Sequence, residues 1–200
     1  MSNYRLEGKT FVIDDYDRKP AFSSFLPGLA GVKGIPLWTF YTNRGQGMNS
    51  FGIDNKGNAI MEFNSANTAF ENTQVKGFRT FLKIDGQYYE PFFQYEDDAK
   101  RSIRMNKNSF KIIENNTKYG IEVTVNYYVL PNESIGALVR QVSVKNTGDK
   151  AKNIEIVDGL PKIITYGIAN GEFKEMSNLF KSWADIKNLE NKVPYYTLRA

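Results

Sequence analysis

The sequence predicts an all-β protein, an antiparallel β-sandwich made of many short strands joined by tight turns. Aromatic residues form 14% of the 200 residues, including 14 Phe and 12 Tyr, and aromatic side chains suit pleated sheets. Twenty asparagines add a residue type that favours turns. Several segments alternate apolar and polar residues between turn signals, which is the period of a half-buried strand.

The N-terminal elements follow from local composition. Thr10 to Tyr16 is a β-branched and aromatic run, which predicts a strand. Phe22 to Gly34 contains Pro27 and three glycines, so we expect a long loop there. Ile35 to Thr42 is apolar and aromatic, which indicates a buried strand.

Turn residues predict two hairpins in the next part of the chain. One has Gly57 in the left-handed conformation, between strands at Ser50–Asp54 and Asn58–Phe63. The other turns at Asp85-Gly86, the strongest hairpin signal in the sequence, between strands at Gly77–Ile84 and Gln87–Phe93.

The strongest strand signal lies in the C-terminal half. Alternate residues from 121 to 129 are apolar or aromatic and should point into one core: Ile121, Val123, Val125, Tyr127 and Val129. Leu138, Val142 and Val144 share a face, as do Ile154 and Ile156 beyond the turn at 146–149, which predicts a further hairpin.

The last part of the chain carries one helical register, at Asn170–Trp183. Val193 to Ala200 is typical of a strand that has just begun, and no turn or polar tail follows it. A strand needs a partner for its backbone groups. We therefore expect residues 1–200 to be an N-terminal β-sandwich domain, truncated at its C-terminal end, of a larger protein.

Composition excludes several kinds of chemistry and of partner. Cysteine and histidine are both absent, so no Ser-His-Asp triad or His-ligated zinc site can form within this chain. Its 26 basic and 22 acidic residues give a net charge of +4 and alternate in sign, so we expect no nucleic-acid partner. No secretory signal and no long apolar stretch is present, which predicts a cytoplasmic protein without a membrane anchor.

Arg140 falls on the apolar phase of its predicted strand. A buried charge requires a partner. We favour a structural ion pair for Arg140, with a ligand-binding role as the alternative.

The densest polar cluster is the segment from Asn43 to Gly47, directly after an aromatic run. Glycines let a backbone approach a ligand, and planar Arg, Asn and Gln groups bind hydroxyls. The candidate substrate-binding residues in and beside this segment are Trp38, Tyr41, Asn43, Arg44, Gln46 and Asn49. The alternative is a strand end with a glycine turn and Trp38 in the core.

Two other segments lack residues that a dinucleotide-binding motif or a calcium-binding loop requires. A dinucleotide-binding fingerprint would need a third glycine at position 50, which is Ser50. Asp14, Asp15 and Asp17 lack the glycine and distal glutamate of a calcium loop and indicate a solvated turn. We therefore expect no catalytic residue, metal site or cofactor in this chain.

Four segments carry a resemblance to a known family. They are GIPLWTFYTNRGQG at 34–47, Asn58–Phe63, Gly77–Lys83 and Asp158–Pro161. With these segments, nearly the whole chain resembles the N-terminal region of cellobiose-phosphorylase-like proteins, in or near glycoside hydrolase family 94 and the related oligoglucan phosphorylases.

The resemblance implies a supersandwich followed, beyond residue 200, by a helical (α/α)₆ barrel that holds the catalytic acid. Inorganic phosphate would be the co-substrate and would invert the anomeric carbon of a cellobiose or β-oligoglucan substrate. The implied partners are the chain's own C-terminal barrel, a second copy in a homodimer and a β-glucan oligosaccharide. The alternative function is a free-standing carbohydrate-binding or structural assembly sandwich.

Overall fold

The computed structural model describes residues 4–165 and 167–199. It is mostly strand, 47%, with 16% helix, arranged in several antiparallel sheets. The predicted all-β sandwich is therefore confirmed.

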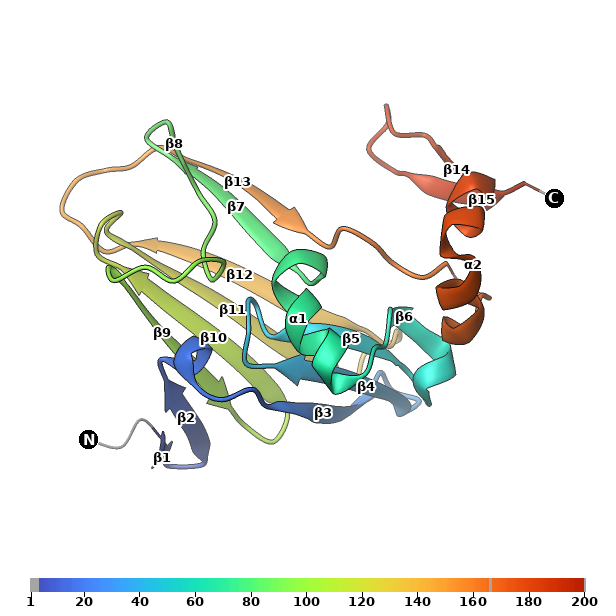
Figure 1. The fold of residues 1–200 in the computed structure, drawn as a ribbon, viewed down its shortest axis with the longest axis horizontal. Coiled ribbons are helices and arrows are strands. Elements are labelled where there is room, and N and C mark those ends of the chain that lie inside the picture. The colour runs from blue at the N-terminus through green and yellow to red at the C-terminus, as the bar shows by residue number, and fades with distance from the viewer. Residues whose placement is uncertain (1–3, 166, 200) are drawn as a thin grey trace.

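One layer of the sandwich is a six-stranded antiparallel sheet in the order β1-β2-β9-β10-β11-β12 (Figure 1). Four consecutive strands, β9 to β12, form a meander, and the N-terminal hairpin adds to its β9 edge. The bounds are β1 Tyr4–Glu7, β2 Thr10–Asp14, β9 Ala99–Met105, β10 Ser109–Asn116, β11 Ile121–Val129 and β12 Leu138–Asn146.

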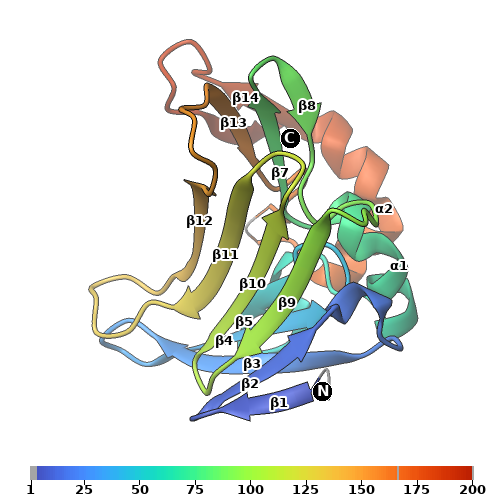
Figure 2. The same cartoon turned by 90° about the vertical axis from the view of Figure 1, so that its left-hand side faces the viewer.

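The opposite layer consists of two smaller sheets. A four-stranded sheet has the order β3-β4-β5-β6, and a three-stranded sheet has the order β13-β7-β8. Figure 2 shows both behind the six-stranded sheet. The bounds are β3 Ser23–Ala30, β4 Ile35–Thr42, β5 Met48–Ile53, β6 Ala59–Met61, β7 Arg79–Ile84, β8 Gln87–Tyr89 and β13 Ile154–Gly159.

The main core lies between these layers and draws residues from both. On β11, alternate residues are fully buried: Ile121, Val123, Val125 and Tyr127 are each 0% exposed. Val129, at the end of the strand, is half-buried. The period of two therefore predicted the inward face of β11 correctly.

In the described part of the chain, two α-helices lie outside the main core. α1, Ala66–Lys76, packs on β5 and β4 and was not predicted. α2, Asn170–Trp183, has the predicted bounds and packs beside the short 3₁₀ turn at Lys56–Asn58. After α2, β14 (Ala184–Lys187) pairs with β15 (Tyr195–Leu198), so the strand expected near the C-terminal end has its partner.

The loop predicted from Phe22 to Gly34 is wrong, because Ser23–Ala30 forms β3. β3 is an edge strand that pairs only with β4, and proline is tolerated at a sheet edge. Gly28 lies against Val129, where a Cβ would be 2.5 Å from Cγ2 of that valine. The glycine thus permits β3 to approach β11 closely instead of breaking the strand.

The predicted hairpins have mixed outcomes. Asp85 and Gly86 have φ of 48° and 88° and turn the β7–β8 hairpin as predicted. The β5–β6 hairpin is also present, but Asp54, with φ of 60°, takes the left-handed conformation that was expected at Gly57. Asn55 accepts a hydrogen bond from the Gly57 amide at 2.8 Å and holds the 3₁₀ turn instead.

The hairpin expected between the strands at Leu138–Val144 and Ile154–Ile156 is wrong. β13 does not join β12 in the six-stranded sheet. It pairs with β7 in the opposite layer, with Ile154 opposite Ile84. The chain therefore crosses from one layer of the sandwich to the other after β12.

Candidate functional site

The predicted polar cluster forms the tight turn between β4 and β5. The Thr42 amide donates to the Gly47 carbonyl at 2.8 Å, and the Gly47 amide donates to the Arg44 carbonyl at 2.9 Å. The side chains of the six candidate residues leave this region in different directions. They do not converge on one pocket.

Tyr41 and Asn43 are occupied by the protein itself. Tyr41 is 7% exposed, and its ring lies 4.5 Å from that of Phe110. Asn43 is fully buried: its Nδ2 donates to the Tyr16 carbonyl at 2.9 Å, and its Oδ1 accepts from the Phe22 amide at 3.0 Å. Asn43 thus ties the β4–β5 turn to the segment before β3.

Arg44 also binds the backbone. Its guanidinium donates to the Asn43 carbonyl at 2.8 Å and the Lys19 carbonyl at 3.2 Å, and it lies 4.3 Å from the Phe70 ring centroid. Burial lowers the pKa of Arg44 from its ordinary value. Its partners are carbonyls and an aromatic face, so it joins the turn to α1.

Gln46 points into a partly buried network around Arg140. Arg140 pairs with Asp158 and donates to the Gln46 Oε1, and its Nε donates to the Tyr127 hydroxyl at 3.1 Å. Thr80 completes the network by donating to Asp158 at 2.6 Å. The ion pair predicted for Arg140 is present, and it links β12, β13, β7 and the β4–β5 turn.

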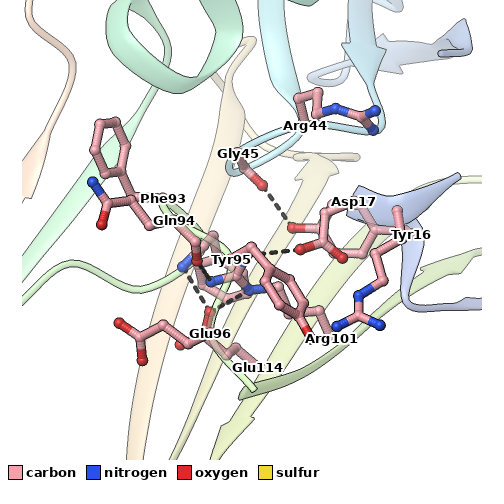
Figure 3. Close-up of polar contacts among 12 residues, drawn as sticks. Tyr16, Asp17, Arg44, Gly45, Phe93, Gln94, Tyr95, Glu96, Arg101 and Glu114 are labelled. Atoms are coloured by element: carbon pink, nitrogen blue, oxygen red, sulfur yellow. Dashed lines mark hydrogen bonds and ion pairs between the residues drawn. The ribbon is translucent and has the colours of Figure 1, made fainter. Parts of the chain in front are cut away.

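A second buried network centres on Arg101 and Glu114 (Figure 3). Arg101 donates to Glu114 at 2.7 Å and to Asp17 at 2.8 Å, and Glu114 also accepts from the Tyr89 hydroxyl. Burial acts to lower the pKa of Arg101, but Glu114, Tyr16 and Asp17 together outweigh it and leave that pKa above its ordinary value. Every group of this pair has a protein partner, so it stabilises the fold.

The Arg101 network also reaches the predicted cluster. The Tyr16 hydroxyl donates to the Gly45 carbonyl at 2.7 Å (Figure 3). Tyr16 is fully buried beside Arg101 and Asp17. The backbone of the β4–β5 turn is therefore held by the core beneath it.

Asn49 lies under α1, at the floor of a cavity of about 420 Å³. It is 4% exposed, and its Nδ2 donates to the Ala69 carbonyl at 3.2 Å and to the Thr73 hydroxyl at 3.3 Å. Its Oδ1 has no hydrogen-bond partner among the residues that the structure describes. Four lysines line this cavity: Lys76, Lys162, Lys174 and Lys181.

Trp38, in the middle of β4, walls a separate cavity of about 400 Å³. Its ring packs edge-on to Phe63 at a centroid distance of 5.6 Å, and its Nε1 donates to the Asn55 carbonyl at 3.1 Å. Phe25 is 51% exposed at the same place. Asp54, Asn55 and Lys56 form the polar rim, so the aromatic cavity combines an apolar wall with hydrogen-bonding groups.

Sequence reasoning missed the neighbours of Trp38 and the lysines around Asn49. Phe25 lay inside the expected loop, and the lysines come from separate segments without a motif. It also missed the Arg101–Glu114 pair. Arg101 lies two residues from Ile103 and Glu114 two residues from Ile112, so each charged residue falls at a position where its strand alternation predicts an inward-facing apolar residue. A charged residue at such a position is the sequence signal that could have identified this buried pair.

No family model matches this chain, and no curated protein matches it either. Within residues 4–165 and 167–199, no group of three Asp or Glu side chains is placed to hold a metal ion. In the same residues, no helix is both long and apolar enough to cross a membrane.

The buried tyrosines predict a loss of stability in alkali. Burial raises the pKa of Tyr127 to about 12, and it also raises the pKa of Tyr16 and of Tyr89. A tyrosine with a raised folded-state pKa stabilises the fold below its unfolded pKa of about 10, and that contribution falls as the pH rises toward the folded value. We expect the free energy of unfolding, measured by urea titration, to fall steeply between pH 10 and 12.

The control for this alkaline loss is Tyr127→Phe, which has no hydroxyl to ionise at this position. Its free energy of unfolding should depend less on pH above pH 10 than that of the unsubstituted chain. Equal slopes for the two proteins would contradict the assignment to Tyr127.

Proposed function

We propose that this chain is the N-terminal, carbohydrate-associated β-sandwich of an inverting β-glucoside phosphorylase and is itself non-catalytic. The resemblance of four segments to cellobiose-phosphorylase-like proteins supports this proposal, and so does the all-β sandwich. In such an enzyme a carboxylic acid on the helical barrel protonates the leaving oxygen. Phosphate, already an anion, attacks the anomeric carbon without the general base that activates water in an inverting hydrolase.

The aromatic cavity at Trp38 is the observation on which the carbohydrate role rests. The faces of pyranose rings carry C–H groups that pack on aromatic side chains, while their hydroxyls need hydrogen-bond partners. Trp38 is held by its bond to the Asn55 carbonyl and by Phe63. Asp54 and Lys56 lie at the rim of the cavity, where sugar hydroxyls would meet them.

Replacing Trp38 with alanine should weaken the binding of cellobiose and cellotriose at least tenfold, because the main apolar wall of the cavity is removed. The measurement is a titration followed by calorimetry and by tryptophan fluorescence. Trp183→Ala is the matched control, because Trp183 is the other tryptophan and lies on α2, outside the aromatic cavity. Trp38→Phe keeps a ring and should retain part of the affinity.

The alternative, a structural assembly role, is favoured by exposed apolar side chains on β13 and around the β14–β15 hairpin. Val157 is 69% exposed, Ile163 57% and Ile186 57%. Such patches mark surfaces that another protein covers, and in the proposed enzyme that protein is the barrel or a second copy. The same titration separates the two roles, since an unsubstituted chain that binds no oligosaccharide favours assembly alone.

A further inference from the structure

The cavity above Asn49 differs from the aromatic cavity in position and chemistry. It lies between α1, the segment around β6, residues 161–162 and α2. We propose that it binds a small phosphate monoester that carries hydroxyl groups, such as a sugar phosphate. This proposal does not rest on the carbohydrate role of Trp38.

Positive charge gathers at this cavity from three separate parts of the fold. Lys76 ends α1, Lys162 follows β13, and Lys174 and Lys181 lie on α2. The two lysines of α2 lie on either side of a break in its helical geometry at Met176, and both line this cavity. Because like charges placed together cost free energy, their convergence calls for an anion.

Acidic groups do not neutralise this charge. Of the carboxylates in the described part of the chain, Glu62 alone lines the cavity, and it pairs with Lys162 at 2.7 Å. Among the described residues, Lys76, Lys174 and Lys181 have no ion pair with a carboxylate. Three ammonium groups therefore remain available to an anion, and a phosphate monoester offers close to two negative charges at neutral pH.

The Asn49 amide adds an independent indication of a ligand. Its Oδ1 is buried without a hydrogen-bond partner, although its Nδ2 is bound on the α1 side. A buried acceptor without a hydrogen-bond partner destabilises the fold. A ligand hydroxyl, acting directly or through a water molecule held beneath it, would satisfy this oxygen.

The remaining walls fit a hydroxylated anion better than a bare one. Asn64 and Asn72 supply amide groups for hydroxyls, and Met61, Val75 and Pro161 supply apolar surface. The volume of about 420 Å³ lies within the usual range of small-molecule sites, about 300–1,000 Å³. Phosphate alone would leave the amides and the apolar surface unused.

The test is calorimetric titration of the full chain at low salt with glucose 6-phosphate, inorganic phosphate and glucose as probes. We expect glucose 6-phosphate to bind most tightly, inorganic phosphate more weakly and glucose most weakly. The variant Lys76→Gln/Lys174→Gln/Lys181→Gln should lose at least tenfold in affinity for glucose 6-phosphate. All three substituted residues are exposed, so the fold should persist, and circular dichroism checks it.

The matched control removes three exposed lysines elsewhere, Lys33→Gln/Lys107→Gln/Lys150→Gln, and so changes the net charge equally. It should bind glucose 6-phosphate as the unsubstituted chain does. The site is overturned if glucose 6-phosphate does not bind, or if both triple variants lose affinity equally. Equal affinities for inorganic phosphate and glucose 6-phosphate would overturn the hydroxyl-bearing part of the proposal.

Discussion

Glu114→Ala should destabilise the folded chain by about 3–5 kcal/mol, the usual cost of removing one partner of a buried ion pair. Glu114 is 0% exposed and accepts hydrogen bonds from Arg101, from the Tyr89 hydroxyl and from the Phe92 amide. Alanine would leave all three donors buried, one of them charged. Denaturant titration measures the loss as a shift of the unfolding midpoint.

Two further variants test this interpretation. Glu155→Ala removes the carboxylate of an exposed pair with Lys83, and it should leave the midpoint nearly unchanged because surface ion pairs contribute little. The double variant Arg101→Met/Glu114→Leu should lose less stability than the two single changes added together, because neither Arg101 nor Glu114 is then left as a buried charge without the other. A midpoint for Glu114→Ala close to that of Glu155→Ala would show that the buried pair is dispensable.

Gly47→Ala should cost about 2–5 kcal/mol, the sum of backbone strain and overpacking. Gly47 has φ of 79°, where residues other than glycine are strained. A Cβ at this position would lie 2.4 Å from Cε1 of Phe110, a side chain that is fully buried. Thermal and urea unfolding of the purified variant measure the effect.

Gly86→Ala separates the two contributions to this cost. Gly86 has φ of 88°, but no atom lies within 4 Å of the position of its Cβ. It should therefore show the strain without the clash and lose about 1–2 kcal/mol. Adding Phe110→Leu to Gly47→Ala should lose less than the two single losses summed, since the leucine frees space. Equal losses for Gly47→Ala and Gly86→Ala would contradict the clash.

The elements that sequence predicted well are those whose signal is local. On β11 every second residue is apolar or aromatic, and Asp85-Gly86 supplies the turn that a two-residue hairpin requires. α1 lacked such a signal because Ala69 and Thr73, its two buried residues, are not strongly apolar. The position of α1 depends on its contacts with β4 and β5, and such tertiary contacts leave no pattern in the local sequence.

Partners distant in sequence were the other source of error. The turn after β12 was interpreted as a hairpin, but the partner of β13 is β7, about seventy residues earlier in the chain. The candidate site shows the same limit. The residue types from Trp38 to Asn49 predicted groups able to bind a ligand, but the role of each side chain depends on where it points in the fold. Asn43 points into the protein and bonds its backbone, whereas Trp38 walls a cavity.

The order of strands in the six-stranded sheet has a consequence for how the chain folds. β9 to β12 pair with sequence neighbours, so this meander needs only short loop closures. β2 instead pairs with β9, and Asp17 meets Arg101 across a separation of 84 residues. During synthesis the N-terminal hairpin therefore leaves the ribosome long before its partner exists. We therefore expect the meander to form first and the earlier-made hairpin to dock on its β9 edge afterwards.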